Sequence, residues 1–190
     1  MHDIEPFFNW RHLYTSEEDE NSPFFGREYS EFEFSHTIYN YYIHPQWDHF
    51  GSHTLYLKLL FVDYDLNFAI IEMIGEWNDA VESDIIALKR DVLDLLIEKG
   101  IYHFIFITEN VLNFHNGDED YYDELYENIG EHHGWMVLLN TPIPTLHDFH
   151  ESRIKSYFHF MEMPDWRTFQ PVDIFQFISN KILKIENQDG

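Results

Sequence analysis

Histidines and carboxylates are the most abundant residues of this chain that could do chemistry, and together they point first to a metal ion. The sequence has 13 His and 35 Asp or Glu in 190 residues. In the loop expected at HPQWDHFGSH, His44, His49 and His53 accompany Asp48, so three imidazoles and a carboxylate could surround one cation. Their spacing is not that of HExxH or of another known ligand pattern. A metal-binding protein or metal-dependent hydrolase is therefore the alternative hypothesis.

A second carboxylate-rich stretch, HNGDEDYYDELYENIGEHHGW, is better explained as a helix. With Asn116 as the cap, the helical spacing predicts one apolar face, formed by Tyr122, Leu125, Tyr126 and Ile129. The spacings from Glu127 and Glu131 to the histidines do not fit the Glu-x-x-His pattern of di-metal helices. We therefore expect its acids to face solvent.

Polar residues follow two strands that the pattern predicts to be buried, IYHFIFI and GWMVLLN. Ligands of open α/β sheets bind outside the carboxyl ends of such strands. The candidate ligand- or partner-binding residues are accordingly Thr108, Glu109, Asn110, Asn116, Asn140 and Thr141. The same side chains could instead cap helices or hold loops by hydrogen bonds.

The hydrophobic periodicity predicts an α/β fold with a mixed sheet. Alternating or apolar runs predict strands at 36–43, 54–62, 67–75, 101–107 and 134–140, and helices at 79–99, after 116 and from Pro171. The first three strands should form an antiparallel edge, and the later ones should join by parallel crossovers with helices packed on the sheet. Residues 146–163 fit either a helix or a strand.

We expect a single domain over 1–190, because no linker or repeat divides the chain. It comprises an aromatic and acidic arm at 1–28, a core at 29–140 and a C-terminal extension at 141–190 with a final helix. In the helix at 79–99, Asp79 is expected to be the cap, Glu82 completes a capping box and Gly100 ends the helix.

The charge is strongly asymmetric, with a formal net value of −24. Residues 153–190 hold five acids and five bases, so the other 30 acids and 6 bases all lie in the first 152 residues. Such a surface repels nucleic acid and favours a basic protein partner or a cation. It could equally serve solubility alone.

Several classes of function lack their signatures in the sequence. Glycine-rich phosphate loops and the GxSxG elbow are missing, and without cysteine there is no thiolate nucleophile. We therefore assign no cofactor and no catalytic residue. No signal peptide and no apolar run of membrane-spanning length are recognisable, so a cytoplasmic, bacterial-type protein without a membrane partner is expected.

Four tryptophans lie in predicted loops or at the ends of elements: Trp10, Trp47, Trp77 and Trp166. Tryptophan is a common anchor of protein interfaces. These residues are thus candidates for partner binding, or else they pack the arm and the tail onto the core.

Residues 67–140 resemble the STAS domain of anti-sigma-factor antagonists and sulfate transporters. The similarity rests on AIIEMIGEWNDAVESDIIALKRDVLDLL, IYHFIFITENVLNFHNGD and GWMVLLN, which follow the family's order of strand, G-E-x-D, helix, buried strand and turn. The family's Asp-Ser-Ser-Gly turn falls at about His115-Asn116-Gly117-Asp118, where no hydroxyl can accept phosphate. The resemblance implies a non-enzymatic protein-binding or regulatory role without the phosphorylation switch.

Overall fold

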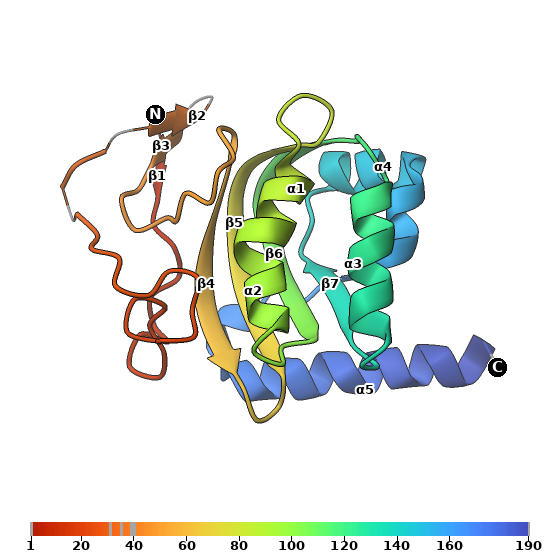
Figure 1. Ribbon diagram of the computed structural model, residues 1–190. Coiled ribbons are helices and arrows are strands. Elements are labelled where there is room, and N and C mark those ends of the chain that lie inside the picture. The colour runs from red at the N-terminus through yellow and green to blue at the C-terminus, as the bar shows by residue number, and fades with distance from the viewer. Residues whose placement is uncertain (1, 31, 35, 39–40, 190) are drawn as a thin grey trace.

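The computed structural model describes residues 2–30, 32–34, 36–38 and 41–189 and has the α/β architecture that the sequence predicts. Its main sheet has the strand order β4-β5-β6-β7-β8 (Figure 1). The antiparallel edge hairpin is confirmed, and all other pairs are parallel. The strands are β4 (Leu55–Asp63), β5 (Phe68–Asn78), β6 (His103–His115), β7 (Trp135–Leu139) and β8 (His159–Met161).

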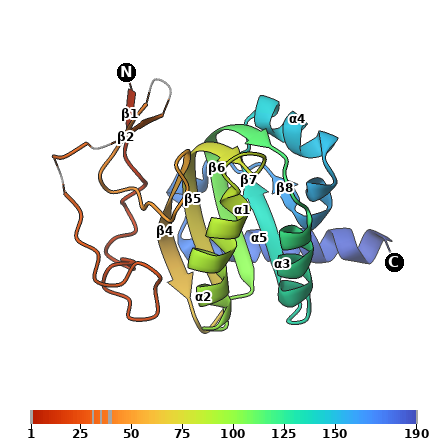
Figure 2. The same ribbon diagram turned by 45° about the horizontal axis from the view of Figure 1, so that its top comes forward.

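Helices cover both faces of this sheet, as Figures 1 and 2 show. One face carries α1 (Asp84–Leu88), the π-helical turn η1 (Lys89–Leu93), α2 (Asp94–Ile97), α3 (Asp120–Gly130), α4 (Ile143–Glu151) and the 3-10 turn η2 (Arg153–Tyr157). The other face carries α5 (Pro171–Asp189), the 3-10 turn η3 (Trp166–Thr168) and part of the arm. None of the helices in the described part of the chain could cross a membrane.

The central strands are apolar on both faces because each face packs against a separate core. Ala69, Ile71 and Met73 of β5 face the core under α1 to α4, whereas Phe68 and Ile70 face the core under α5. This two-sided burial is typical of parallel strands covered by crossover helices.

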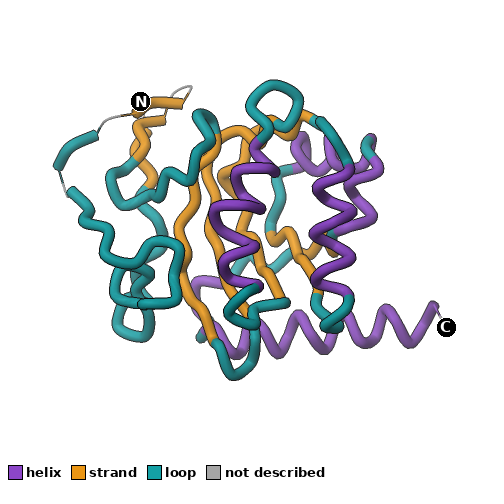
Figure 3. Tube along the Cα trace, viewed as in Figure 1, coloured by secondary structure: helices purple, strands orange, loops and turns teal. Residues whose placement is uncertain are grey.

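The arm packs on the domain, although most of its length is loop (Figure 3). Phe24 lies in the core under α1 and α2, and Trp10 lies in the core with α5. The four tryptophans are only 3% (Trp10), 5% (Trp47), 0% (Trp77) and 0% (Trp166) exposed. Their prediction as exposed interface anchors is wrong. The alternative, that they pack the arm and the tail onto the core, holds for Trp10 and Trp166, whereas Trp77 belongs to β5 itself and Trp47 lies in a separate small cluster.

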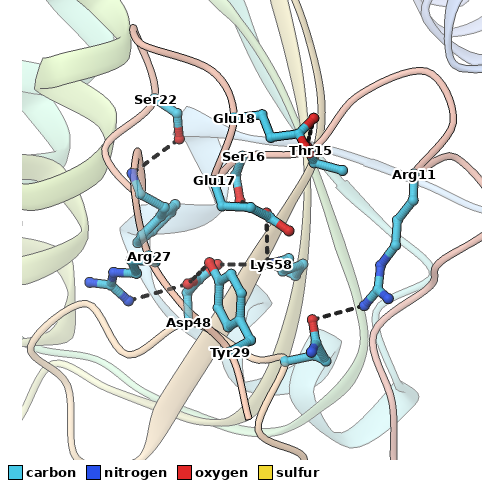
Figure 4. A network of polar contacts seen from close by, with 12 residues as sticks. Arg11, Thr15, Ser16, Glu17, Glu18, Ser22, Arg27, Tyr29, Asp48 and Lys58 are labelled. Atoms are coloured by element: carbon cyan, nitrogen blue, oxygen red, sulfur yellow. Dashed lines mark hydrogen bonds and ion pairs between the residues drawn. The ribbon is translucent and has the colours of Figure 1, made fainter. Parts of the chain in front are cut away.

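A buried charge network attaches the arm to β4 (Figure 4). The Asp48 carboxylate accepts hydrogen bonds from Tyr29 (2.5 Å) and Arg27 (3.2 Å), and the Lys58 ammonium lies 3.5 Å from it. Lys58 Nζ also lies 3.8 Å from Glu17 and 3.7 Å from the centre of the Tyr29 ring. Burial raises the pKa of Asp48 and lowers that of Lys58, so in each case desolvation outweighs the attraction between the two.

The predicted strand at 36–43 is instead two short strands, and neither joins the main sheet. β2 (His36–Ile38) and β3 (Tyr41–Ile43) pair with each other, and β1 (His2–Ile4) pairs with β3. Tyr39 and Asn40 lie outside the described residues. The outer edge of β4 is occupied by Asp48, whose backbone N–H and C=O both bond to Leu57.

The first long helix begins at Asp84 and not at Asp79, so the predicted capping box is wrong. Ser83 precedes it in the left-handed conformation, with φ of 56°. Asp79 still accepts the Ile85 N–H (2.8 Å), but its other carboxylate oxygen accepts the Tyr122 hydroxyl and its N–H donates to His115. These contacts hold residues 79–83 as a loop. The end at Gly100, with φ of 90°, is confirmed.

The acidic helix α3 begins at Asp120, and Asn116 is not its cap. Gly117 packs against Asp79, since an added Cβ would lie 2.5 Å from the Asp79 carbonyl oxygen, so this segment runs as a turn beside the 79–83 loop. The apolar face is confirmed for Tyr122, Leu125 and Ile129, whereas Tyr126 is 50% exposed.

The undecided stretch at 146–163 contains the larger part of α4, then η2 and the edge strand β8. The final helix begins at Pro171 as predicted. Its buried stripe is Ile174, Ile178 and Ile182.

Candidate functional site

Four of the six predicted ligand-binding residues come together at the carboxyl end of β7: Asn140 and Thr141 follow β7, and Thr108 and Glu109 lie beside them in the middle of β6, just past its last pair with β7. The Thr108 and Thr141 hydroxyls lie 2.8 Å apart. An open depression of about 360 Å³ lies beside them, lined by Glu109, Asn140, Thr141, Glu162 and Pro164. We call it the carboxyl-end depression.

The other two predicted residues lie away from this depression. Asn110 pairs with Ile74 of β5, and Asn116 follows the last residue of β6. The separation arises because β6 continues past Ile107, where its pairing with β7 ends, and stays paired with β5 as far as His115.

All four residues make hydrogen bonds within the fold, and two of them, Asn140 and Thr108, bond to the backbone. The Asn140 side chain accepts the Met163 N–H (2.7 Å) and donates to the Met163 carbonyl (3.0 Å), while Thr108 also donates to Leu139 O (3.3 Å). These bonds fix the chain after β8 against the end of β7. The Asn140 and Thr108 side chains therefore hold loops by hydrogen bonds, which is the alternative to ligand binding that the sequence left open.

Glu109 carries the charge of the site and is bound by a cation of its own chain. Arg167 donates two guanidinium hydrogen bonds to its carboxylate, one of them 3.1 Å long, and the Trp166 indole N–H donates a third (3.3 Å). Arg167 is nonetheless 43% exposed in its side chain and lies over the Trp166 ring. The pair demonstrates that a guanidinium fits this carboxylate in bidentate geometry.

A buried carboxylate, Glu72 of β5, lies next to this pair. It accepts the Phe7 N–H (2.7 Å), and its other oxygen lies 3.6 Å from Arg167 and has no hydrogen-bond partner among the described residues. Burial raises the pKa of Glu72 to about 7, Phe7 and Arg167 oppose the shift, and Glu109 adds to it. Glu72 could have been found from the sequence, because it is the one charge within the apolar run AIIEMIG.

Glu72 should make the stability of the protein fall as the pH rises. Its pKa is higher in the folded state than its ordinary 4.5, so folding takes up a proton between pH 4.5 and about 7 and stability is lost through that window. Between pH 5 and pH 8 we expect the wild type to lose about 2 kcal/mol of unfolding free energy relative to Glu72→Gln.

Urea unfolding of both proteins at the two pH values measures this difference. Burial also raises the pKa of Asp79, to about 6, but that contribution is present in both proteins and cancels. Parallel pH profiles of wild type and variant would contradict a raised pKa at Glu72.

A second depression adjoins the first and is mainly apolar. Its volume is about 270 Å³, and it shares Thr141 and Glu162 with the carboxyl-end depression. Its other lining residues come from β7, α4 and β8: Leu138, Leu146, Phe160 and Met161. Glu162 thus lines both the carboxyl-end depression, which is acidic, and the apolar depression. Neither Glu162 nor Arg167 was predicted, because Glu162 lies in the segment 146–163, whose structure the sequence leaves undecided, and Arg167 follows that segment.

The three histidines of the predicted metal site do not converge. His44 accepts the Gln46 N–H (3.2 Å), and its ring lies against Phe34. The rings of His49 and His53 are 6.4 Å apart, and His49 stacks on His36. Asp48 is engaged by Arg27 and Tyr29. Within the residues that the structure describes, no group of three His, Asp or Glu side chains could hold a metal ion.

The carboxyl-end depression therefore offers oxygen acceptors, two of them carboxylates, beside an apolar surface. Such a lining suits a ligand that brings hydrogen-bond donors and positive charge. Comparison with known proteins gives no match to a family model, to a curated protein or to a solved structure.

Proposed function

We propose that this protein is a non-enzymatic binding domain that docks a basic segment of a partner protein in the carboxyl-end depression. The observation that carries the proposal is the pairing of Glu109 with Arg167 at the surface, beside Glu162. An arginine of a partner would find the same acceptor in Glu109 by displacing Arg167, and a further carboxylate in Glu162.

The charge of the whole molecule supports this choice of partner. A net charge of −24 attracts a basic segment from a distance and speeds its association, with an effect that salt weakens. The apolar depression on the other side of Glu162 adds contact area for a side chain next to the arginine.

The resemblance to STAS domains belongs to the same proposal. The elements from β5 to β7 follow the order strand, helix, buried strand, turn, helix and strand, and residues 75–78 of GEWND form the end of the first strand. At the position of the family's phosphorylatable turn, Gly117 packs on Asp79, and no serine or threonine is present in His115–Asp118. We infer docking without a phosphorylation switch.

Fluorescence anisotropy with a labelled peptide, Ser-Leu-Arg-Val-Arg-Leu-Ser, tests the proposal. We expect it to bind at least about tenfold more tightly than the same peptide with citrulline in place of arginine, because citrulline keeps the shape and loses the charge. The difference should shrink as NaCl is raised from about 0.05 to 0.5 M.

Two matched variants locate the binding. Glu162→Gln should weaken binding of the arginine peptide about fivefold, a typical effect for one partly exposed ion pair. Glu98→Gln removes the same charge from the exposed end of α2 and should change the affinity less than about twofold. Equal losses in both variants would show diffuse attraction to an acidic protein, and equal binding of the two peptides would refute the proposal.

A further inference from the structure

The strand β8 forms an edge of the main sheet with one side open. It pairs with β7 through His159, Phe160 and Met161, and within the described residues no strand pairs with its other side. The opposite edge, β4, is different because the loop residue Asp48 bonds to it. Exposed strand edges are templates for a further strand.

One hydrogen bond shows to which side the backbone N–H and C=O groups of β8 point. The Met161 carbonyl accepts the Asn140 N–H (2.9 Å), so the polar backbone groups of Met161 point toward β7. Successive residues of a strand point these groups to opposite sides. The N–H and C=O of Phe160 therefore point away from β7, where no hydrogen bond from a described residue reaches them.

Depressions lie on both faces of this edge. The apolar depression, with Leu138, Leu146 and Phe160, lies on the side of α4. A wider one of about 700 Å³ lies on the side of α5, and its lining includes His159, Ile185 and one base, Lys181. Side chains of an extended segment alternate between the two faces of a sheet, so a segment beside β8 would place side chains in both.

We propose that β8 accepts an extended, basic and apolar segment of a partner protein as an added strand, with a basic side chain at Glu162. This inference rests on the proposed function and specifies how the partner binds. Glu162 directly follows β8 and lines both depressions beside this edge as well as the carboxyl-end depression. A second copy of this chain fits the edge less well, because each copy carries a net charge of −24.

Backbone methylation of the Ser-Leu-Arg-Val-Arg-Leu-Ser peptide tests the pairing. Methylating the nitrogens of one alternating set removes the donors that face β8 and should weaken binding at least about tenfold. Methylating the other set leaves those donors intact and should weaken binding much less. The parent peptide and the two methylated peptides carry the same charge, so a difference in binding cannot come from charge.

A pair of variants tests the same contact from the protein. Phe160→Ala keeps the outward N–H, whereas Phe160→Pro removes it, and proline is tolerated on an edge strand where its nitrogen faces solvent. We expect the proline variant to bind the peptide at least about fivefold more weakly than the alanine variant, with circular dichroism and thermal melts used to verify that both are folded.

The outcomes separate this inference from the proposed function. If both methylated peptides bind like the parent while the citrulline peptide still binds weakly, strand addition is wrong and the basic-segment proposal stands. If citrulline changes nothing, the proposed function fails. If the protein sedimenting alone is a dimer that the peptide dissociates, the occupant of the edge is a second copy and this inference is overturned.

Discussion

Replacing Lys58 by methionine is expected to lower the free energy of unfolding by about 3–5 kcal/mol, because it leaves a buried carboxylate without its nearest ammonium. Asp48 is fully buried, and the Lys58 side chain is only 8% exposed. Arg27 and Tyr29 still contact one Asp48 oxygen, but the other loses the Lys58 ammonium, which lies 3.5 Å from it. Urea unfolding at pH 7 measures the loss.

A double variant and a surface control make this prediction specific. Asp48→Asn together with Lys58→Met should cost less than the sum of the two single changes, because desolvation already outweighs their attraction in the wild type. Lys99→Met removes the same charge at an exposed site and should change the stability by less than about 0.5 kcal/mol. A Lys58→Met cost below about 1 kcal/mol would mean that the network does not hold the arm to β4.

Replacing Trp77 by alanine is expected to cost about 3–5 kcal/mol, the range for large aromatic residues in a core. The ring is fully buried and makes edge-on contacts with Phe106, Phe114, Phe149 and Phe158 at 5.9–6.5 Å between centroids. Its N–H also donates to Asp79 (3.2 Å), so the variant loses a hydrogen bond to a buried carboxylate.

The conservative change Trp77→Phe separates the packing from the hydrogen bond. It retains an aromatic ring but cannot donate to Asp79, so we expect it to cost less than half as much as alanine. Thermal and urea unfolding should both give the same order of stability: wild type, then Trp77→Phe, then Trp77→Ala. A tolerated alanine would indicate that β5 and α4 do not share one packed core at this position.

The sequence predicts the sheet well where burial alone decides the structure. The strands β5, β6 and β7 are runs of apolar residues that need cover on both faces, and the end of α2 is fixed by Gly100 in its left-handed conformation. The starts of the helices were misplaced because Asp79 and Asn116 resemble caps locally. Their roles are set by contacts between the 79–83 loop and the 115–118 turn, which are distant in sequence.

The candidate site was predicted in part, for a similar reason. Thr108, Glu109, Asn140 and Thr141 could be found because parallel strands end at one edge of a sheet. Glu162 and Arg167 could not, since their position depends on β8 joining the sheet as a fifth strand. The metal site predicted in the histidine loop does not form, because Asp48 and the imidazoles have other partners that residue types and spacing do not reveal.

Mapping where arginine binds tests the central claim most directly. In a two-dimensional ¹H–¹⁵N NMR titration with N-acetyl-arginine amide, and with the citrulline analogue as the uncharged reference, we expect saturable shifts at Glu109, Thr141 and Glu162 for arginine alone. Shifts spread over the acidic helix α3 and the arm, or identical shifts with citrulline, would contradict a specific site for a basic partner at the carboxyl ends of the strands.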